Sequence, residues 1–577
     1  MSDPLSRAAG VVGAYGDKRH DPSKGDSIEL TTPECASFSS PDSGIKDTLP
    51  QEDENIGLMY DEAEEALLAG HEGIEEQEVL ATRDMDPALS KKMHLVNNAI
   101  DEIGWTGYHW KLFVLNGFGY AVDSLLLRVQ AIVQPQVGKE WNPPFARGLT
   151  VALYVGLLFG ALFWGITADI MGRRLAFNTS LMMCSVCAII AGAAPNFDAL
   201  ALLVSLSAFG GGGNLILDTT VFLEYLPSKH QWVLTLLAGW WSLGEIVAAL
   251  VAWPLMANFS CESEADCAKA DNMGWRYVWY SLGTLVFVMS LLRFLVMNLK
   301  ETPKYLLGQG RDVEVVETLH YIATTYKRHC SLTAEKLSNC GVTRSSKGQN
   351  MLGTGQLKVH VQGLFSSREM GRSTLLIWLS WTLIGLAYPL YNVFLPEYLA
   401  SRGARLGDGS TNTTYKNYSI VTVFGILGPV LAAYLCEVSF LGRRGTMVIG
   451  ALITSQSNFP FLSKAILTLA VVFLFAYTQV RTPGQNLGFN CAITFSLNIY
   501  YGCLYAYTPE VLPSAHRATG TGVAVAFNRM MGILSAVVAT VADTRTSVPI
   551  FLCAGLYIVM AIVAVLFPFE PYGRRSA

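Results

Sequence analysis

The chain has 577 residues, of which 51% are hydrophobic and 15% are charged, and its mean hydropathy is +0.34. This composition is too apolar for a soluble enzyme of this length, and it is typical of a polytopic membrane protein. The formal net charge is −5, and the sequence contains no basic patch of the kind that binds nucleic acid. Lipid is therefore expected as a partner, and nucleic acid is not.

The first part of the chain, residues 1–88, is polar and contains no apolar run of spanning length. Eleven acidic residues and no Lys or Arg occur between Gln51 and Glu78, which predicts a disordered acidic cytoplasmic tail. No cleaved signal peptide is expected. Apolar residues then recur at helical spacing, at Met93, Val96, Ile100 and Ile103. They predict a short amphipathic helix within 89–109, before the first membrane span.

Twelve apolar segments follow, at lengths that suit about 30 Å of hydrocarbon. They are 110–133, 147–168, 175–194, 199–222, 232–255, 276–298, 373–396, 418–440, 446–480, 487–509, 518–541 and 548–567. The Lys and Arg bias of the connecting loops places both termini in the cytoplasm. The fold class predicted is an all-α polytopic membrane protein with twelve transmembrane helices. Its parts are a six-helix half (110–298), a central cytoplasmic loop (299–372), a second six-helix half (373–567) and a short tail (568–577).

The loop after the second segment contains the motif GxxxDxxGRR, formed by Gly165, Asp169, Gly172, Arg173 and Arg174. Its glycines allow close helix approach and a tight turn, and its arginines hold the turn on the cytoplasmic side. A degenerate copy consists of Ala433, Glu437, Gly442, Arg443 and Arg444. A second matched pair, E-x-L-P-S-x-H, begins at Glu224 and again at Glu510. Two matched pairs in the same order indicate an internal duplication into two six-helix halves.

The ninth segment, 446–480, is too long for one span. The interval from Gly172 to Glu224 is 52 residues, whereas the interval from Gly442 to Glu510 is 68. The surplus falls near 453–468, and either a broken helix or an insertion explains it.

Three Asn-x-Ser/Thr sequons, at Asn258, Asn412 and Asn417, fall in or beside loops that the predicted topology places outside. They are candidates for glycosylation. A fourth sequon, at Asn178, would lie at the cytoplasmic end of the third segment.

The eleven cysteines show no metal-ligand grouping, and no metal is expected. Cys184 and Cys187 form a CxxC pattern inside an apolar segment, which favours packing. Cys261 and Cys267 fall in a polar loop predicted to lie outside, where a disulfide and free thiols both remain open.

Four ionisable side chains fall inside predicted spans: Asp123, Asp218, Glu245 and Arg529. A charge at mid-membrane costs about 2.5 to 3.5 kcal/mol, so these residues are expected to face a water-filled cavity or a partner. Desolvation favours the protonated form of a carboxylate, which makes the three acidic residues candidates for proton coupling. Structural ion pairs with Arg128 or Arg529 are the alternative.

Polar and aromatic side chains share one face of several predicted spans, as cavity-lining residues do. The candidates are Asn116, Tyr120, Arg128, Asn214, Tyr388, Tyr391, Asn392, Asn490, Thr494, Asn498, Tyr501, Tyr505 and Arg529. Hydroxylated rings suit sugars or other small polar solutes, and an inward Arg suits carboxylates or phosphate.

The GxxxDxxGRR loop resembles the signature loop between helices 2 and 3 of the major facilitator superfamily. The stretches GYAVDSLLLRVQAIVQPQV, GGGGNLILDTTVFLEYLP and AYTPEVLPSAHRATGTG are similar to the branch that contains synaptic vesicle glycoprotein-related and fungal metabolite or sugar-type transporters. The resemblance covers about 90–570. It implies alternating access around a central site between the halves, often with proton symport.

These observations predict a secondary active transporter that moves a small polar or anionic metabolite, namely a sugar, an organic acid or a phosphate-like solute, together with H+. We expect it in the plasma membrane, with a vacuolar or other endomembrane as the alternative, as a monomer without a cofactor. A non-transporting membrane sensor and an efflux carrier are the rival interpretations. A primary pump and an enzyme are disfavoured, because the sequence has neither a phosphate-binding loop nor a cluster of nucleophile, base and orienting group outside the spans.

Overall fold

The structure is a computed structural model that describes residues 87–145, 147–261, 267–296, 299–341, 360–401, 411–455, 482–541 and 548–571. The predicted acidic tail, the surplus near 453–468 and the end of the C-terminal tail fall wholly or largely outside these residues. Every regular element within the described ranges is a helix, which agrees with the all-α prediction.

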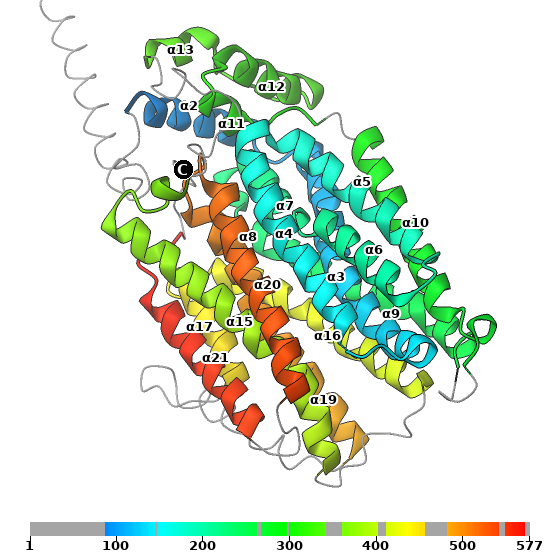
Figure 1. Ribbon diagram of the computed structural model, residues 1–577. Coiled ribbons are helices and arrows are strands. Elements are labelled where there is room, and N and C mark those ends of the chain that lie inside the picture. Colours follow the sequence, from blue (N-terminus) through cyan, green and yellow to red (C-terminus); the bar gives the residue numbers. More distant parts are fainter. Residues whose placement is uncertain are drawn as a thin grey trace, which may run out of the picture. The chain divides into compact units, whose positions relative to one another are not determined.

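The helices of the first half are α3 (Gly107–Trp141), α4 (Gly148–Met171), α5 (Arg173–Ala191), α6 (Phe197–Gly211), α7 (Asn214–Tyr225), α8 (Trp232–Leu237), α9 (Gly239–Asn258) and α10 (Gly274–Val296). The second half contains α15 (Arg368–Ser401), α16 (Thr411–Cys436), α17 (Gly442–Ser455), α19 (Pro483–Val511), α20 (Arg517–Val541) and α21 (Val548–Leu566), shown in Figure 1. Short 3-10 helices, η1 (Ser228–His230) and η2 (Lys269–Asp271), lie in two connections of the first half.

Nine helical stretches within the described residues are long and apolar enough to cross a membrane. Two of them combine neighbouring helices: Phe197–Tyr225 joins α6 with α7, and Ser228–Asn258 joins η1, α8 and α9. The three remaining predicted spans correspond to α17, α19 and α21. These three helices are not among the nine stretches for different reasons. Helix α17 is followed by residues that the structure does not describe, and α19 carries the most polar of the predicted stripes. Helix α21 contributes only the shorter apolar stretch Gly555–Leu566.

The packing of the helices follows the predicted duplication. In the first half α3 packs on α9, α4 on α6, α5 on α6 and α5 on α10. The corresponding pairs of the second half are α15 with α20, α16 with α19, α17 with α19 and α17 with α21. The halves meet along two equivalent pairs, α4 with α20 and α9 with α16. The same neighbours recur in the same order, and the two six-helix halves predicted from the sequence are confirmed.

A glycine run separates α6 from α7. A Cβ atom on Gly212 would lie 2.5 Å from the carbonyl oxygen of Leu157, and one on Gly213 would lie 2.4 Å from Cβ of Trp164. Any larger residue would therefore push α4 away from this junction. The glycine run therefore allows α4 to pack closely against the junction of α6 and α7.

The predicted amphipathic helix is α2 (Pro87–Ile103), and it packs on α11 (Pro303–Gly308) and α12 (Asp312–Thr325). A third helix of the central loop, α13 (Ala334–Asn339), follows α12. The apolar side of α2 is buried, and Lys92 on the same helix, although charged, is also buried and lies 2.5 Å from Asp312. Glu102 accepts a hydrogen bond from the backbone N–H of Ser331 (2.8 Å), and this bond and His329 lower the pKa of Glu102 to about 2.

The first span begins earlier than predicted: Gly104 (φ 65°) ends α2 in a left-handed conformation, and α3 starts three residues later, at Gly107. Thr106 then starts α3 with a capping box: its backbone N–H donates to Nδ1 of His109 at 3.1 Å. The segment 89–109, predicted as one pre-membrane helix, thus consists of most of α2 and the first residues of α3.

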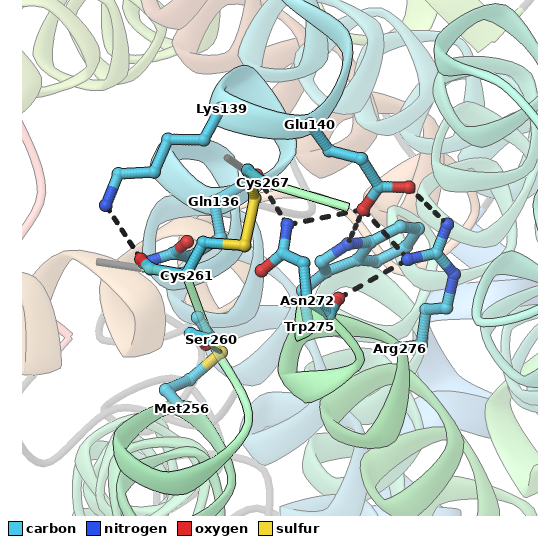
Figure 2. The surroundings of a disulfide bond; sticks show 10 residues. All are labelled: Gln136, Lys139, Glu140, Met256, Ser260, Cys261, Cys267, Asn272, Trp275 and Arg276. Atoms are coloured by element: carbon cyan, nitrogen blue, oxygen red, sulfur yellow. Dashed lines mark hydrogen bonds and ion pairs between the residues drawn. A yellow bond between two sulfur atoms is a disulfide. The ribbon is translucent and has the colours of Figure 1, made fainter. Parts of the chain in front are cut away.

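At the other end of α3, a disulfide joins Cys261 and Cys267 in the connection between α9 and α10. Figure 2 shows Glu140 of α3 directed at the start of α10, next to this connection. Its carboxylate accepts hydrogen bonds from Arg276 (2.7 Å) and Trp275 (2.9 Å). The disulfide closes a small loop beside an ion pair that ties α10 to α3.

We expect the change of Cys261 and Cys267 to Ser to lower the free energy of unfolding by about 2 kcal/mol, because a short closed loop restricts the unfolded chain only moderately. Thermal unfolding of the purified protein measures the effect, with Cys340→Ser, a free thiol, as the control. An unchanged unfolding temperature in the double variant contradicts the expectation.

Candidate functional site

The GRR turn of the first half is held by a carboxylate that follows the last span of the same half. Gly172 has a φ of 105°, a conformation that favours glycine, and α5 starts directly after it. Glu301 accepts hydrogen bonds from the backbone N–H groups of Arg173 (2.9 Å) and Arg174 (3.3 Å). A carboxylate thus caps the N-terminus of α5.

The second half repeats this arrangement. Gly442 has a φ of 56°, and Glu570 accepts hydrogen bonds from the backbone N–H groups of Arg443 (2.8 Å) and Arg444 (3.0 Å). Glu301 and Glu570 follow the last span of their halves at equivalent places. They form a third matched pair of the duplication, which the sequence analysis missed because E-T-P and E-P are too short to be recognised as a repeat.

The side chain of Arg173 is buried among groups of both halves. It lies 3.2 Å from Asp169, 3.3 Å from Glu224, and 4.6 Å from the ring centre of Tyr305. It also donates to the carbonyl oxygen of Ser514, in the second E-x-L-P-S-x-H motif, at 3.0 Å. The two predicted motifs therefore meet in space. We call this end of the helix bundle the motif end.

Asp169 also reaches across to the second half. It accepts hydrogen bonds from the backbone N–H and the hydroxyl of Thr519, both at 2.8 Å. Close helix approach makes this contact possible: a Cβ atom on Gly165 would lie 2.9 Å from the carbonyl oxygen of Ala518. The motif end is therefore closed along the contact between α4 and α20.

The copy in the second half keeps one of the two acidic partners, because Glu510 is the counterpart of Glu224. Arg443 pairs with Glu510 (2.5 Å), and it donates across to the first half, to Thr235 (2.5 Å) and the carbonyl oxygen of Gln231 (3.1 Å). Glu437, at the place equivalent to Asp169, is exposed. The degenerate copy keeps the contact between the halves, and hydrogen bonds that Arg443 donates to a hydroxyl and a carbonyl oxygen take the place of the Asp contact.

Deeper in the bundle, Asp123 of α3 pairs with Arg529 of α20. Both side chains are buried, and the two residues belong to different halves. Among the described residues, Oδ1 of Asp123 and Nε of Arg529 have no hydrogen-bond partner. The pair was one of the two interpretations of Asp123 that the sequence left open.

Asp218 of α7 pairs instead with Arg293 of α10, at 2.8 Å, and both belong to the first half. Arg293 also donates to the carbonyl oxygens of Leu115 (3.1 Å) and Phe177 (3.0 Å). The alternative left open by the sequence was an ion pair with Arg128 or Arg529, and the structure gives Asp218 a different arginine as its partner. Arg293 lies inside the apolar segment 276–298. A search for every ionisable side chain within the predicted spans, which singled out the other four, could also have found it.

We expect Asp218→Asn to lower the free energy of unfolding by about 3 to 5 kcal/mol, because it leaves the fully buried Arg293 without its carboxylate. Glu245→Gln is the matched control: Glu245 pairs with Arg128 at 2.9 Å, and their side chains are 10% and 21% exposed, so water can compensate. Thermal unfolding in detergent compares the two. Equal losses of stability in both variants contradict the expectation.

Tyr505 of α19 stands at the centre of an aromatic group that both halves contribute to. Its ring centre lies 5.0 Å from that of Trp381 and 5.6 Å from that of Tyr501 in the second half. From the first half, Tyr120 and Trp241 lie at 5.7 Å and 6.0 Å. Predicted stripes of α3 and α19 thus face each other.

The polar residues of the same stripes differ in their contacts. Asn498 donates to Ser242 of the first half at 3.2 Å. Asn214 accepts a hydrogen bond from Ser180 of α5 at 2.9 Å, so its oxygen serves packing within the first half. Asn116 donates to the carbonyl oxygen of Leu112, and its own oxygen has no partner among the described residues.

The remaining candidates lie as follows. Tyr388 is 6.1 Å from Tyr501 between ring centres, Asn490 donates to Asn486 at 3.2 Å, and Thr494 is half-buried on α19. The side chains of Tyr391, Asn392 and Asn412 fall outside the description, whereas Asn417 is half-buried in α16 and Asn258 is exposed at the end of α9.

Comparison with known proteins identifies a family model and several relatives that match this chain. The family model of the Major Facilitator Superfamily matches residues 113–536. The "MFS siderochrome iron transporter 1" of Ceriporiopsis subvermispora is 41% identical over 505 residues, which are 85% of this chain and 93% of that protein. The "Synaptic vesicle 2-related protein" of Xenopus laevis is 25% identical over 83% of this chain and 82% of its own length, in agreement with the predicted branch.

Among solved structures, the proton:xylose symporter XylE bound to 6-bromo-6-deoxy-D-glucose superposes with a TM-score of 0.60 at 15% identity, over 81% of this chain and 98% of that chain. At this identity the match concerns the fold. Together with the family model and the relatives, it shows that the chain belongs to the major facilitator superfamily of membrane transporters.

Proposed function

We propose that this chain is a proton-coupled transporter of a small organic anion, in which Asp123 binds the proton and Arg529 binds the anionic group. The observation that carries the proposal is the buried ion pair between these residues, because it joins α3 of one half to α20 of the other. Alternating access requires the halves to move against each other. The pair therefore has to break or re-form during each cycle.

Breaking the pair without replacement would leave two buried charges unpaired, which is strongly unfavourable. A proton on Asp123 and an anion on Arg529 remove both charges together. Each ligand thus lowers the cost of binding the other, and this is the thermodynamic definition of coupling. The proposal selects organic anions from the predicted substrate classes because Arg529 offers a planar guanidinium, which suits a carboxylate.

The surroundings support a ligand at this place. The hydroxyl of Tyr120 and one oxygen each of Asn116 and Asp123 are buried without a hydrogen-bond partner among the described residues. Buried polar atoms normally find partners, which a bound substrate or water can supply. The ring of Tyr505, with Trp381 and Trp241 around it, offers an apolar wall for the carbon skeleton of the anion.

The other two acidic candidates receive different roles in this proposal. Asp218 and Arg293 lie in one half and move together, so we assign them to stability. Glu245 and Arg128 also share one half, but they are partly exposed, and we assign them to the rim of the substrate path. The motif end, where the halves are in contact, is taken as cytoplasmic, and the plasma membrane as the location.

The test is the pH change inside proteoliposomes that contain the purified protein and a trapped pH dye. Pools of carboxylates, phosphate and sugars are added in turn. Acidification of the lumen with carboxylates and not with sugars is the expected result. Acidification with sugars alone overturns the assignment to anions. No response to any pool, from protein shown to be folded, favours the rival sensor or an uncoupled carrier, which uptake of labelled carboxylates then separates.

A further inference from the structure

A groove lies at the start of α15, apart from the central ion pairs. Its volume is about 570 Å³, and its lining includes Phe365, Arg368, Gly371, Arg372, Leu375 and Leu376. No acidic residue is among the residues that line it. The proposed transport mechanism uses none of them.

One side of the groove is cationic. Arg368 and Arg372 are one helical turn apart on α15, and both are exposed. Arg372 donates to the carbonyl oxygen of Leu566, the last residue of α21, at 3.3 Å. Arg444 donates to the adjacent carbonyl of Val565 at 2.6 Å, which brings a third arginine to the same corner. Three positive charges thus surround the junction of α15 and α21.

The groove also lies at one end of an apolar stretch that is long enough to cross a membrane. The apolar stretch of α15 that is long enough to span a bilayer is Arg368–Leu390, so both lining arginines fall in its first turns. Such positions lie near the level of the lipid headgroups, where phosphates attract Lys and Arg.

An apolar surface continues from the groove along the same helix. Leu375 is 55% exposed and Leu379, one turn further, is 42% exposed. On neighbouring α21, Val565 and Leu566 are 50% and 44% exposed. In a membrane protein such exposed apolar side chains face lipid acyl chains. Along α15 the two arginines are therefore followed by an apolar surface in the direction of the bilayer core.

We propose that this groove binds an anionic phospholipid. The phosphate and the acidic headgroup lie against Arg368 and Arg372, and an acyl chain lies along Leu375 and Leu379. Charge complementarity selects an anionic lipid over a zwitterionic one, and the apolar wall selects a lipid over free phosphate. Basic pockets at the ends of membrane helices bind lipid headgroups in this way.

Native mass spectrometry of the full-length protein, incubated with phosphatidylserine or phosphatidylcholine, tests the proposal. We expect phosphatidylserine to be retained preferentially. In Arg368→Gln/Arg372→Gln its apparent affinity is expected to fall about 30-fold, because each cation near the surface contributes about fivefold. Lys327→Gln/Arg328→Gln removes the same charge from an exposed turn after α12 and is the matched control.

A second variant separates the groove from its charge. A Cβ atom on Gly371 would lie 3.2 Å from the ring of Phe365, so Gly371→Leu fills the groove and leaves both arginines in place. We expect it also to lose phosphatidylserine. Inorganic phosphate at millimolar concentration is expected not to displace the lipid.

Three outcomes would overturn the proposal. The first is equal retention of phosphatidylserine and phosphatidylcholine by the wild type. The second is an equal loss of phosphatidylserine in Arg368→Gln/Arg372→Gln and in the control variant Lys327→Gln/Arg328→Gln. The third is displacement of bound phosphatidylserine by inorganic phosphate. Because lipid retention is measured without transport, these results are independent of the proposed function.

Discussion

Replacing Asp123 by Asn is expected to abolish substrate-driven proton uptake while the protein still reaches the membrane and still exchanges substrate. An amide resembles the protonated carboxyl group in shape and charge, and its oxygen can still accept a hydrogen bond from Arg529. It cannot take up or release the proton. Accumulation of substrate by a pH gradient, which reaches about tenfold per pH unit when one proton moves with each anion, should therefore be lost.

Two measurements check this expectation. Proteoliposomes with a pH dye report proton uptake, and exchange of labelled substrate across the same membrane reports binding and alternation. Glu245→Gln removes another of the three acidic candidates, from an ion pair that lies within one half. Because Glu245 is assigned to the rim of the substrate path, this variant can change the rate of uptake, but proton uptake should remain coupled to substrate. If Asp123→Asn still acidifies the lumen on addition of substrate, Asp123 is not the proton site.

Arg529→Gln should have the complementary effect. The guanidinium that we propose as the anion site is lost, and Asp123 becomes a buried carboxylate without its partner. Substrate exchange as well as proton uptake should then disappear. The contrast with Asp123→Asn, which keeps exchange, distinguishes an anion site from a proton site.

The second large effect is expected at the motif end, where Arg173→Gln should loosen the contact between the halves. The variant removes ion pairs with Asp169 (3.2 Å) and Glu224 (3.3 Å) and the hydrogen bond to Ser514 (3.0 Å). Loss of one partner from a buried charge cluster costs about 3 to 5 kcal/mol, because the remaining charges stay desolvated. The closed arrangement of this end should lose stability by this amount.

Hydrogen exchange of the backbone N–H of Thr519 reports the loosening, because this group donates to Asp169 across the contact between the halves. Its exchange should accelerate by about 100-fold if the local opening becomes about 3 kcal/mol easier. Arg173→Lys should not restore protection, since an ammonium cannot make the same set of contacts as a planar guanidinium. Arg174→Gln is the control, because the contact of Arg174 with Glu301 is made by its backbone. Equal exchange in the wild type and Arg173→Gln contradicts the expectation.

Local sequence determined the helices of this protein and their duplication. Apolar length is a property of a single segment, and it predicted the spans because a membrane imposes one thickness on all of them. The glycines of the GRR turns were also recognisable, since only a residue without a side chain readily adopts the φ values of Gly172 and Gly442.

Only the tertiary structure decided which charges are partners. Asp123 and Asp218 lie in similar apolar surroundings in the sequence, yet one meets Arg529 of the other half and the other meets Arg293 of its own half. Glu301, far along the chain from Arg173, caps the helix that Arg173 starts. A charged residue within an apolar segment predicts a partner, because removing a charge from water is costly everywhere in the membrane. Which partner it finds depends on how separate helices pack, and residues distant along the chain determine that packing.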